Sequence, residues 1–295
     1  MKRIIVGLLG VIMIVSFAGC GKTEKKVVVA SKPMTEQYIL AEMITKLIEA
    51  NTDIKVEKKL GIGGGTSNIQ PAMVKGDIDI YPEYTGTGWL FVLKKELIND
   101  PNKLYEEVKK EYLNKYGIKW LGLYGFNDTY TLAIKKSLAE KLNINTYSDL
   151  AAKSGSLILG AEYDFYERED GYKGLQKTYG FNFRENKELD IGLKYSAINS
   201  GNVDVINAFS TDSMLKQYEL KVLKDDKNFF PSYFGATLIR QETLKKYPEL
   251  ENLLNKLQGK ISNEEMTQMN YEVEKDKKDP KDVAGEFLKS KGLIK

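Results

Sequence analysis

Histidine is absent from the 295 residues, and cysteine occurs once, as Cys20. These absences exclude Ser-His-Asp and Cys-His nucleophilic catalysis, His-ligated metals, cysteine zinc sites and any disulfide within the chain. The remaining possibilities are catalysis by carboxylates, catalysis by lysine, or no catalysis. Because the chain carries 18 tyrosines, we favour a binding protein over an enzyme, and we expect neither a metal nor a cofactor.

Net charge is also small, since 44 basic residues against 41 acidic ones leave +3. Proteins that bind nucleic acid usually carry a basic stripe or patch, whereas the lysines here have acidic neighbours along predicted helices. We therefore expect no nucleic acid as a partner. The hydrophobic share of 42% is enough for a sizeable core and two domains. No apolar run after residue 26 is long enough to span a bilayer.

The longest apolar run lies near the N-terminus. Two basic residues precede residues 4–17, whose length is typical of a signal-peptide core and too short for a stable transmembrane span. A Phe-Ala-Gly-Cys sequence ends the segment and resembles the lipobox of bacterial lipoproteins, with Phe in place of the usual Leu. We predict a lipoprotein signal peptide over 1–19, lipidation of Cys20 and a polar tether over 20–26; a plain signal peptide is the alternative. The protein would then be lipid-anchored on the extracytoplasmic face of the cell membrane.

Strand and helix patterns alternate along the rest of the chain. Val27–Ala30 has the continuous apolar pattern of a buried parallel strand, and a helix with Thr35 as its N-cap follows. The Gly-rich turn at 61–66 lacks the Gly-Lys-Ser/Thr of a phosphate-binding loop, so we interpret it as a point of close backbone approach. The alternation predicts an α/β fold. Further strands are predicted over 54–60, 78–81, 118–123, 131–134, 157–160 and 203–208, and further helices over 104–116, 171–179 and within 241–291.

Two segments of the chain echo each other, Gly76–Thr85 and Gly201–Ser210. Each contains a glycine, an aspartate between two β-branched residues, and an aromatic residue eight positions after the glycine, Tyr84 or Phe209. Both rings would lie at the carboxyl end of a strand, where ligands bind in open α/β sheets. If two lobes face each other, these rings line the cleft between them; a coincidental strand-and-turn pattern is the alternative.

Two more aromatic residues, Tyr130 and Tyr233, fall in predicted turns or at strand ends. A quaternary ammonium group cannot donate a hydrogen bond and is weakly hydrated, so a cage of aromatic faces suits it. Asp128, two positions before Tyr130, could add a carboxylate. For each ring, ordinary packing is the alternative interpretation.

Several segments of the sequence closely resemble the substrate-binding proteins of osmoprotectant ABC transporters, which take up glycine betaine, carnitine or choline. The Tyr-Pro-Glu-Tyr-Thr-Gly-Thr motif is specific, and the resemblance extends from about Val27 to the C-terminus. It implies a type II periplasmic-binding-protein fold, with one lobe from residues 27–128 and 232–295, the other from 131–228, and a ligand cleft between them. The segments are Ser31–Gln37, Gly76–Thr87, Phe126–Tyr130 and Phe209–Asp212.

By this resemblance, Tyr84, Tyr130 and Tyr233 look like three walls of the family's aromatic cage. Phe209 stands where the family usually has Tyr, which keeps an aromatic face but loses a hydroxyl and weakens the attraction for a cation. The substitution affects affinity and ligand ranking more than ligand class.

The resemblance also implies polar contacts. Arg168 resembles the family's carboxylate-binding arginine, whose planar fork suits bidentate contact, although a surface ion pair with Glu167 or Asp170 is the alternative. Lys32 and Thr87 are similar to weaker donors from the other lobe. Ser67 resembles a variable position that influences restriction to choline, and serine there argues against such restriction.

We therefore predict a receptor that captures quaternary-ammonium osmolytes for osmoprotection and delivers them to an ABC permease in the membrane, performs no chemistry and is a monomer. A receptor of the same fold for another cation or amino acid is the first alternative. A carboxylate-pair glycosidase that uses Asp79 with Glu83 or Asp128 is the alternative from another class.

Overall fold

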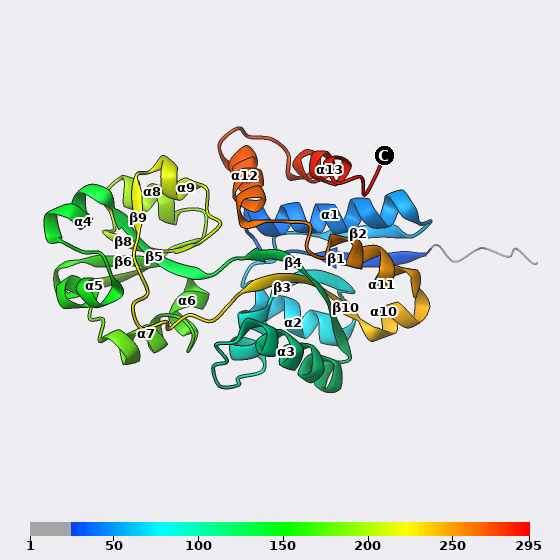
Figure 1. The fold of residues 1–295 in the computed structure, drawn as a ribbon, viewed down its shortest axis with the longest axis horizontal. Coiled ribbons are helices and arrows are strands. Elements are labelled where there is room, and N and C mark those ends of the chain that lie inside the picture. The colour runs from blue at the N-terminus through cyan, green and yellow to red at the C-terminus, as the bar shows by residue number, and fades with distance from the viewer. Residues whose placement is uncertain (1–24) are drawn as a thin grey trace, which may run out of the picture.

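A computed structural model describes residues 25–295 and folds them into two α/β lobes (Figure 1). Lobe I is built around a five-stranded sheet of order β2-β1-β3-β10-β4, and lobe II around a five-stranded sheet of order β7-β6-β8-β5-β9. The predicted two-lobed α/β fold is confirmed. Lobe I contains β1 (Lys26–Ala30), β2 (Lys55–Lys59), β3 (Ile80–Tyr84), β4 (Ile118–Asn127) and β10 (Phe234–Arg240); lobe II contains β5 (Tyr130–Lys135), β6 (Ile158–Ala161), β7 (Glu185–Glu188), β8 (Val205–Phe209) and β9 (Leu220–Val222).

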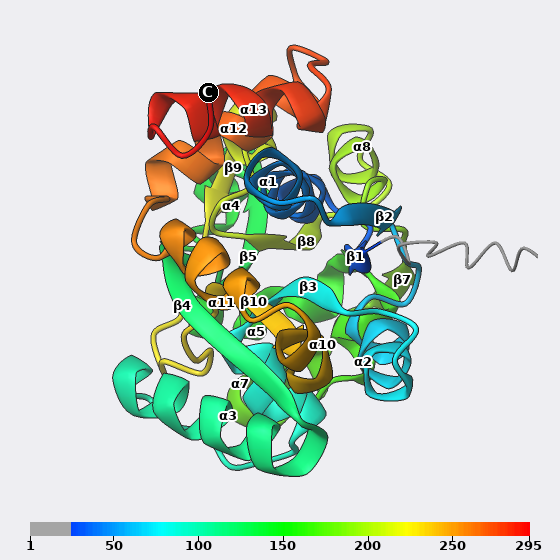
Figure 2. The same ribbon diagram turned by 90° about the vertical axis from the view of Figure 1, so that its right-hand side faces the viewer.

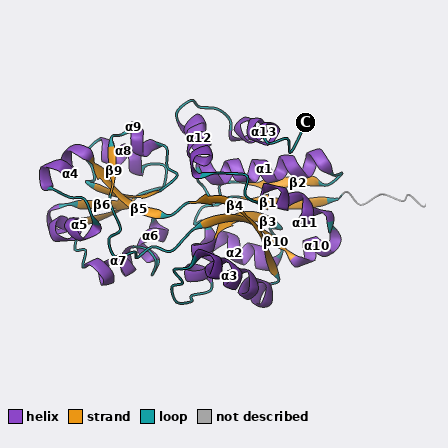
Figure 3. Ribbon diagram, in the orientation of Figure 1, coloured by secondary structure: helices purple, strands orange, loops and turns teal. Residues whose placement is uncertain are grey.

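Helices cover both faces of each sheet (Figures 2 and 3). In lobe I, α1 is buried by contact with α11, α12 and α13 on one face of the sheet, while α2 and α3 lie on the other. Lobe I has α1 (Thr35–Asn51), α2 (Thr66–Lys75), the π-helical turn η1 (Thr87–Val92), α3 (Pro101–Tyr116), α10 (Gln241–Lys246), α11 (Glu249–Leu254), η3 (Asn255–Leu257), α12 (Asn263–Glu274) and α13 (Pro280–Ser290). Lobe II has α4 (Lys136–Leu142), α5 (Tyr147–Lys153), η2 (Ser154–Ser156), α6 (Tyr163–Glu167), α7 (Tyr172–Tyr179), α8 (Lys194–Asn199) and α9 (Met214–Gln217).

The chain crosses between the lobes twice. The first crossing joins the end of β4 directly to the start of β5, and the second runs from β9 back to β10. Both sheets are mixed. In lobe I, β1 is parallel to β3 and β10 is antiparallel to β3; in lobe II, β6 is parallel to β8 and β5 is antiparallel to β8. The carboxyl end of β3 pairs with the start of β10, and the carboxyl end of β8 pairs with the start of β5. The ends of β3 and β8 therefore both lie next to the crossings, on opposite sides of the boundary between the lobes.

The two echoed segments of the sequence form the same local structure. Gly76 and Gly201 each follow a helix with a positive φ, 95° and 77°, a conformation that favours glycine. Asp79 then accepts a 2.9 Å hydrogen bond from the backbone N–H of Val28, and Asp204 accepts one of 2.8 Å from that of Ile158. Each aspartate therefore ties its strand to the parallel neighbour, and the strand ends on Tyr84 or Phe209 eight residues after the glycine.

Some predicted features differ from the structure. The N-cap of α1 is Met34, with no side-chain hydrogen bond, and Thr35 is the first helical residue. Lys26, placed in the tether, already belongs to β1, and the predicted signal peptide and Cys20 lie outside the described residues. Among residues 25–295, no helix is both long and apolar enough to cross a bilayer.

Candidate functional site

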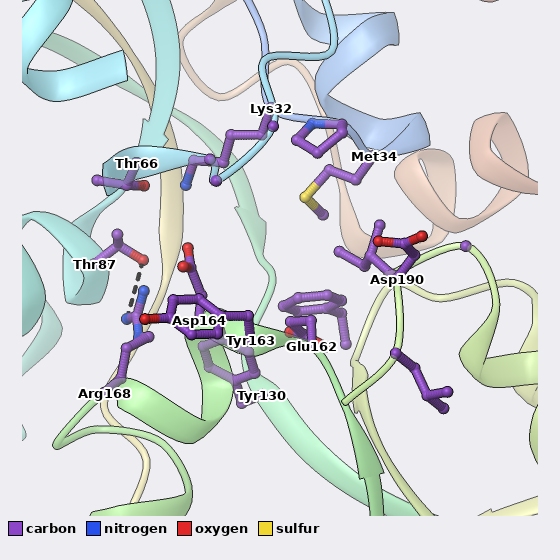
Figure 4. Close-up of a pocket in the computed structure, with 18 of the residues that line it drawn as sticks. Lys32, Met34, Thr66, Thr87, Tyr130, Glu162, Tyr163, Asp164, Arg168 and Asp190 are labelled. Carbon is purple, nitrogen blue, oxygen red and sulfur yellow. Dashed lines mark hydrogen bonds between the residues drawn. The ribbon is translucent and has the colours of Figure 1, made fainter. Parts of the chain in front are cut away.

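A cavity of about 680 Å³ lies between the lobes, and eight of the nine side chains predicted to bind ligand line it (Figure 4). Lobe I contributes the loop before α1, the Gly-rich turn and the end of β3, while lobe II contributes α6, the segment before α8 and the end of β8. The eight are Lys32, Tyr84, Thr87, Asp128, Tyr130, Arg168, Phe209 and Tyr233.

Three of the four aromatic residues form one continuous cluster. The ring centroid of Tyr130 lies 4.9 Å from that of Phe209 and 5.4 Å from that of Tyr233, which it meets edge to face. Gly86 makes room for Tyr233, because a Cβ at Gly86 would lie 2.6 Å from that ring. These side chains come from β5, β8 and the segment before β10, so the arrangement depends on both crossings between the lobes.

The fourth ring, Tyr84, is fixed by charged neighbours. Its hydroxyl donates a 2.5 Å hydrogen bond to Glu36, and the ammonium group of Lys32 lies 4.9 Å from the ring centroid. Lys32 in turn is held by Glu83, a fully buried carboxylate on β3 at 2.5 Å. Tyr84 therefore enters the cavity with a cation of the protein already over its face.

Glu83 accepts four hydrogen bonds. One oxygen accepts from the Lys32 ammonium and, at 2.8 Å, from the backbone N–H of Tyr84; the other accepts from Thr66 at 2.7 Å and from Tyr81 at 2.9 Å. A buried carboxylate needs this degree of compensation. In the glycosidase alternative, one of the two carboxylate pairs used Glu83 as a free acid or base, and these four bonds commit both of its oxygens to structure.

Arg168 is buried, in contrast to the surface ion pair that was its alternative interpretation. Its Nε and Nη2 atoms both donate to Asp170, with 2.8 Å from Nε to Oδ1, and Tyr233 donates to Asp170 at 2.8 Å. Nη2 also lies 3.5 Å from the Thr87 hydroxyl of lobe I, the dashed contact in Figure 4. Asp170 thus fixes the plane of the Arg168 guanidinium where this side chain lines the cavity.

Ser67 is the predicted residue that the structure places elsewhere. It is exposed and does not line the cavity, whereas the adjacent Thr66 does and bonds to Glu83. Both lie in the first turn of α2, where consecutive side chains point about 100° apart. Thr66 therefore faces the cavity in this structure while Ser67 faces outward, and an influence of Ser67 on ligand choice stays a prediction.

Two buried carboxyls, Glu36 and Asp128, are bridged by the hydroxyl of Thr211. The Thr211 hydroxyl lies 2.7 Å from Glu36 and 2.8 Å from Asp128, but a hydroxyl can donate to only one of them. The other carboxyl must therefore donate. Burial raises the pKa of Glu36 to about 7, and burial together with the negative charge of Glu36 raises the pKa of Asp128 well above its usual range. The pair therefore holds at least one proton and presents at most one negative charge to the cage.

Residues 25–290 match the family described as the substrate binding domain of ABC-type glycine betaine transport systems. The chain belongs to this family. It is 49% identical over 270 residues to the ergothioneine transport permease/ergothioneine binding protein EgtU of Helicobacter pylori (strain G27), covering 92% of this chain but only 48% of that protein, about half its length.

Two further relatives match over their whole length. The carnitine transport binding protein OpuCC of Listeria monocytogenes serotype 1/2a (strain 10403S) is 38% identical, with 98% of this chain and 97% of that one covered. A crystal structure of a glycine betaine/carnitine/choline ABC transporter has a TM-score of 0.72 at 36% identity, covering 91% of this chain and all of that one. Substrate-binding domains of this family bind small molecules outside the cytoplasm and work with ABC permeases.

The carboxyl pair of this substrate-binding domain predicts a dependence of stability on pH. Glu36 has an ordinary pKa of 4.5 and a folded-state pKa of about 7, so the folded state binds the proton more tightly. Its contribution to stability is complete below about pH 4.5 and is lost as pH rises through about 7, by at most about 1.4 kcal/mol per pH unit. We expect Glu36→Gln, whose amide mimics the protonated acid, to flatten this loss in urea unfolding measured from pH 4.5 to 8. Parallel curves for the two proteins would contradict the assignment.

Sequence reasoning gave no supporting role in this substrate-binding domain's cavity to three acidic residues, Glu36, Glu83 and Asp170. Glu83 left a signal, because it lies in a strand whose five residues are all buried, where a carboxylate requires partners. Asp170 lies two residues from Arg168, and this spacing fits an exposed ion pair on the surface as well as a buried one. Glu36 is in the first turn of α1, where an acid is common for helix-dipole reasons, so its role could not be inferred from position alone.

Proposed function

We propose that this protein captures a trimethylammonium compound, with zwitterions such as glycine betaine and carnitine and the cation choline as candidates, and delivers it to an ABC permease for osmoprotection. The single observation that supports this most strongly is that one cavity combines a cluster of aromatic faces with the buried guanidinium of Arg168. Aromatic faces attract a quaternary ammonium, and a guanidinium edge attracts a carboxylate. The protein needs no catalytic group for this role.

The ligand would connect the lobes. Tyr84, Lys32 and Thr87 belong to lobe I, whereas Arg168 and Phe209 belong to lobe II. A ligand that contacts both lobes stabilises the arrangement in which they are close together. The permease would then recognise the occupied form.

Ergothioneine is a second candidate ligand. It is also a trimethylammonium zwitterion, but it carries an imidazole-thione ring with N–H donors. Beyond the aromatic cluster the cavity is lined by four carboxylates that could accept hydrogen bonds from such donors, and the relative with 49% identity is named for this compound. The four are Glu162, Asp164, Glu188 and Asp190.

Calorimetric titration of the chain from residue 21 onward tests the proposal. Glycine betaine, carnitine, choline and ergothioneine are each titrated, with proline as a cyclic control that lacks a quaternary nitrogen. We expect micromolar or tighter binding of at least one trimethylammonium compound and no heat from proline. No binding of any of the four would leave the fold intact but overturn the proposed ligand class.

We further propose that Cys20 is lipidated after removal of residues 1–19, that the mature protein is a monomer anchored outside the cytoplasm, and that the lobe boundaries are 27–128 with 232–295 and 131–228. The support for the anchor is the position of the chain's one cysteine at the end of the apolar run. Mass spectrometry of the N-terminal peptide would detect the added acyl chains, and Cys20→Ala should abolish them.

A further inference from the structure

Phe209 separates the ligand cavity from a second cavity of about 440 Å³. Both cavities are lined by Phe209 and by parts of the loops before α1 and α8, but the second extends towards α12. The second cavity is lined by Lys194, the first residue of α8, which does not line the ligand cavity. Lys194 therefore lies on the far side of Phe209 from the ligand cavity.

Lys194 is unusual among the described residues because its ammonium group is buried and donates no hydrogen bond. Its Nζ lies 4.6 Å from the ring centroid of Phe209 and 3.7 Å from Oε2 of Glu162, which is also buried without a hydrogen-bond partner. Asp212 and Glu274 line the second cavity, and both carboxyls interact electrostatically with Lys194. Asp212 accepts from Tyr195 and from the backbone N–H of Phe209, and it accepts no hydrogen bond from Lys194. The Lys194 ammonium itself lies against the ring of Phe209 and beside Glu162.

We propose that Lys194 determines the charge selectivity of the aromatic cage, disfavouring ligands that bring a net positive charge relative to zwitterions. This inference rests on the proposed function, in which a trimethylammonium group lies against the cavity side of Phe209. The Lys194 ammonium and the ligand ammonium then lie on the two sides of one ring and repel each other. A zwitterion offsets this repulsion through its carboxylate, whereas choline has no carboxylate to do so.

The size of the effect follows from Coulomb's law. A ligand cation within about 6 Å of the Phe209 centroid would be on the order of 10 Å from Nζ across the ring. At an effective dielectric constant of about 20, this repulsion changes affinity by roughly tenfold. Glu162, Asp212 and Glu274 compensate the charge of Lys194 in part. All three are present whichever ligand binds, so the comparison of a zwitterion with a cation isolates the charge of the ligand.

The test compares choline with glycine betaine, which share the trimethylammonium group, using the full chain in a non-ionic detergent. Lys194→Gln removes the charge and keeps a polar side chain, while Lys194→Arg keeps the charge. Lys177→Met is the matched control for net charge, since its side chain is 70% exposed and paired with Glu169. The quantity measured is the ratio of the two dissociation constants, choline over glycine betaine.

We expect Lys194→Gln to lower this ratio about tenfold, mainly by tightening choline, while Lys194→Arg and Lys177→Met leave it within about threefold of the wild type. An unchanged ratio in Lys194→Gln, or an equal loss of both ligands, would assign Lys194 to packing and overturn the inference while the proposed function stands. If the wild type binds neither compound, the inference fails, and titration with carnitine and ergothioneine then decides whether the proposed function stands.

Discussion

Replacing Arg168 with alanine should lower the free energy of unfolding by about 3–5 kcal/mol and abolish binding of zwitterions. The cause of the instability is Asp170, whose carboxylate is buried and would keep only the hydroxyl of Tyr233 as a side-chain partner. The cause of the binding defect is separate, because the carboxylate of betaine or carnitine would lose its bidentate partner.

A double variant separates the two effects. Arg168→Ala with Asp170→Asn removes the unpaired charge, so urea unfolding should recover much of the lost stability while betaine binding stays absent. Choline has no carboxylate and should retain most of its affinity in the double variant. Equal losses of choline and betaine there would show that Arg168 shapes the cavity without contacting a carboxylate.

Replacing Glu83 with alanine should cost a similar amount, about 3–5 kcal/mol, because it leaves the Lys32 ammonium without its partner in a largely buried position. The hydroxyls of Thr66 and Tyr81 and the N–H of Tyr84 would also lose their acceptor. We expect ligand affinity to fall as well, since Lys32 would no longer be held over the ring of Tyr84.

Tyr81→Phe is the control for this prediction. It removes one of the four hydrogen bonds to Glu83 without disturbing the charge pair, so its cost in urea unfolding should be only about 1 kcal/mol. If Glu83→Ala were no more destabilising than Tyr81→Phe, the Lys32–Glu83 pair would contribute little beyond a single hydrogen bond.

Strands buried on both faces were predictable because burial leaves an apolar run in the sequence, as in β1 and β8. β7 was missed because all four of its residues are polar, as suits an edge strand. β10 was missed although it lies at the centre of the lobe I sheet. Its short apolar run, interrupted by Gly235, gave no periodicity that distinguishes a strand from the start of the helical region after it.

The aromatic residues were found from strand ends and from motif, which are local signals. Neither signal predicts the charged and polar side chains that pack around these rings. Lys194 reaches Glu162 across 32 positions of sequence, and Glu36 meets Thr211 across 175. The first pair joins separate segments of lobe II and the second joins the two lobes, so both depend on the tertiary fold and no spacing in the sequence encodes them.

The position of β10 also constrains the order in which the protein can be completed. This strand lies between β3 and β4, yet every strand of lobe II precedes it in the chain. A polypeptide emerging from the ribosome can therefore finish lobe II first, while the facing edges of β3 and β4 stay unpaired until about residue 240 is available. During that interval the nascent lobe I exposes two strand edges to intermolecular pairing, so early termination within the second crossing would yield an aggregation-prone product.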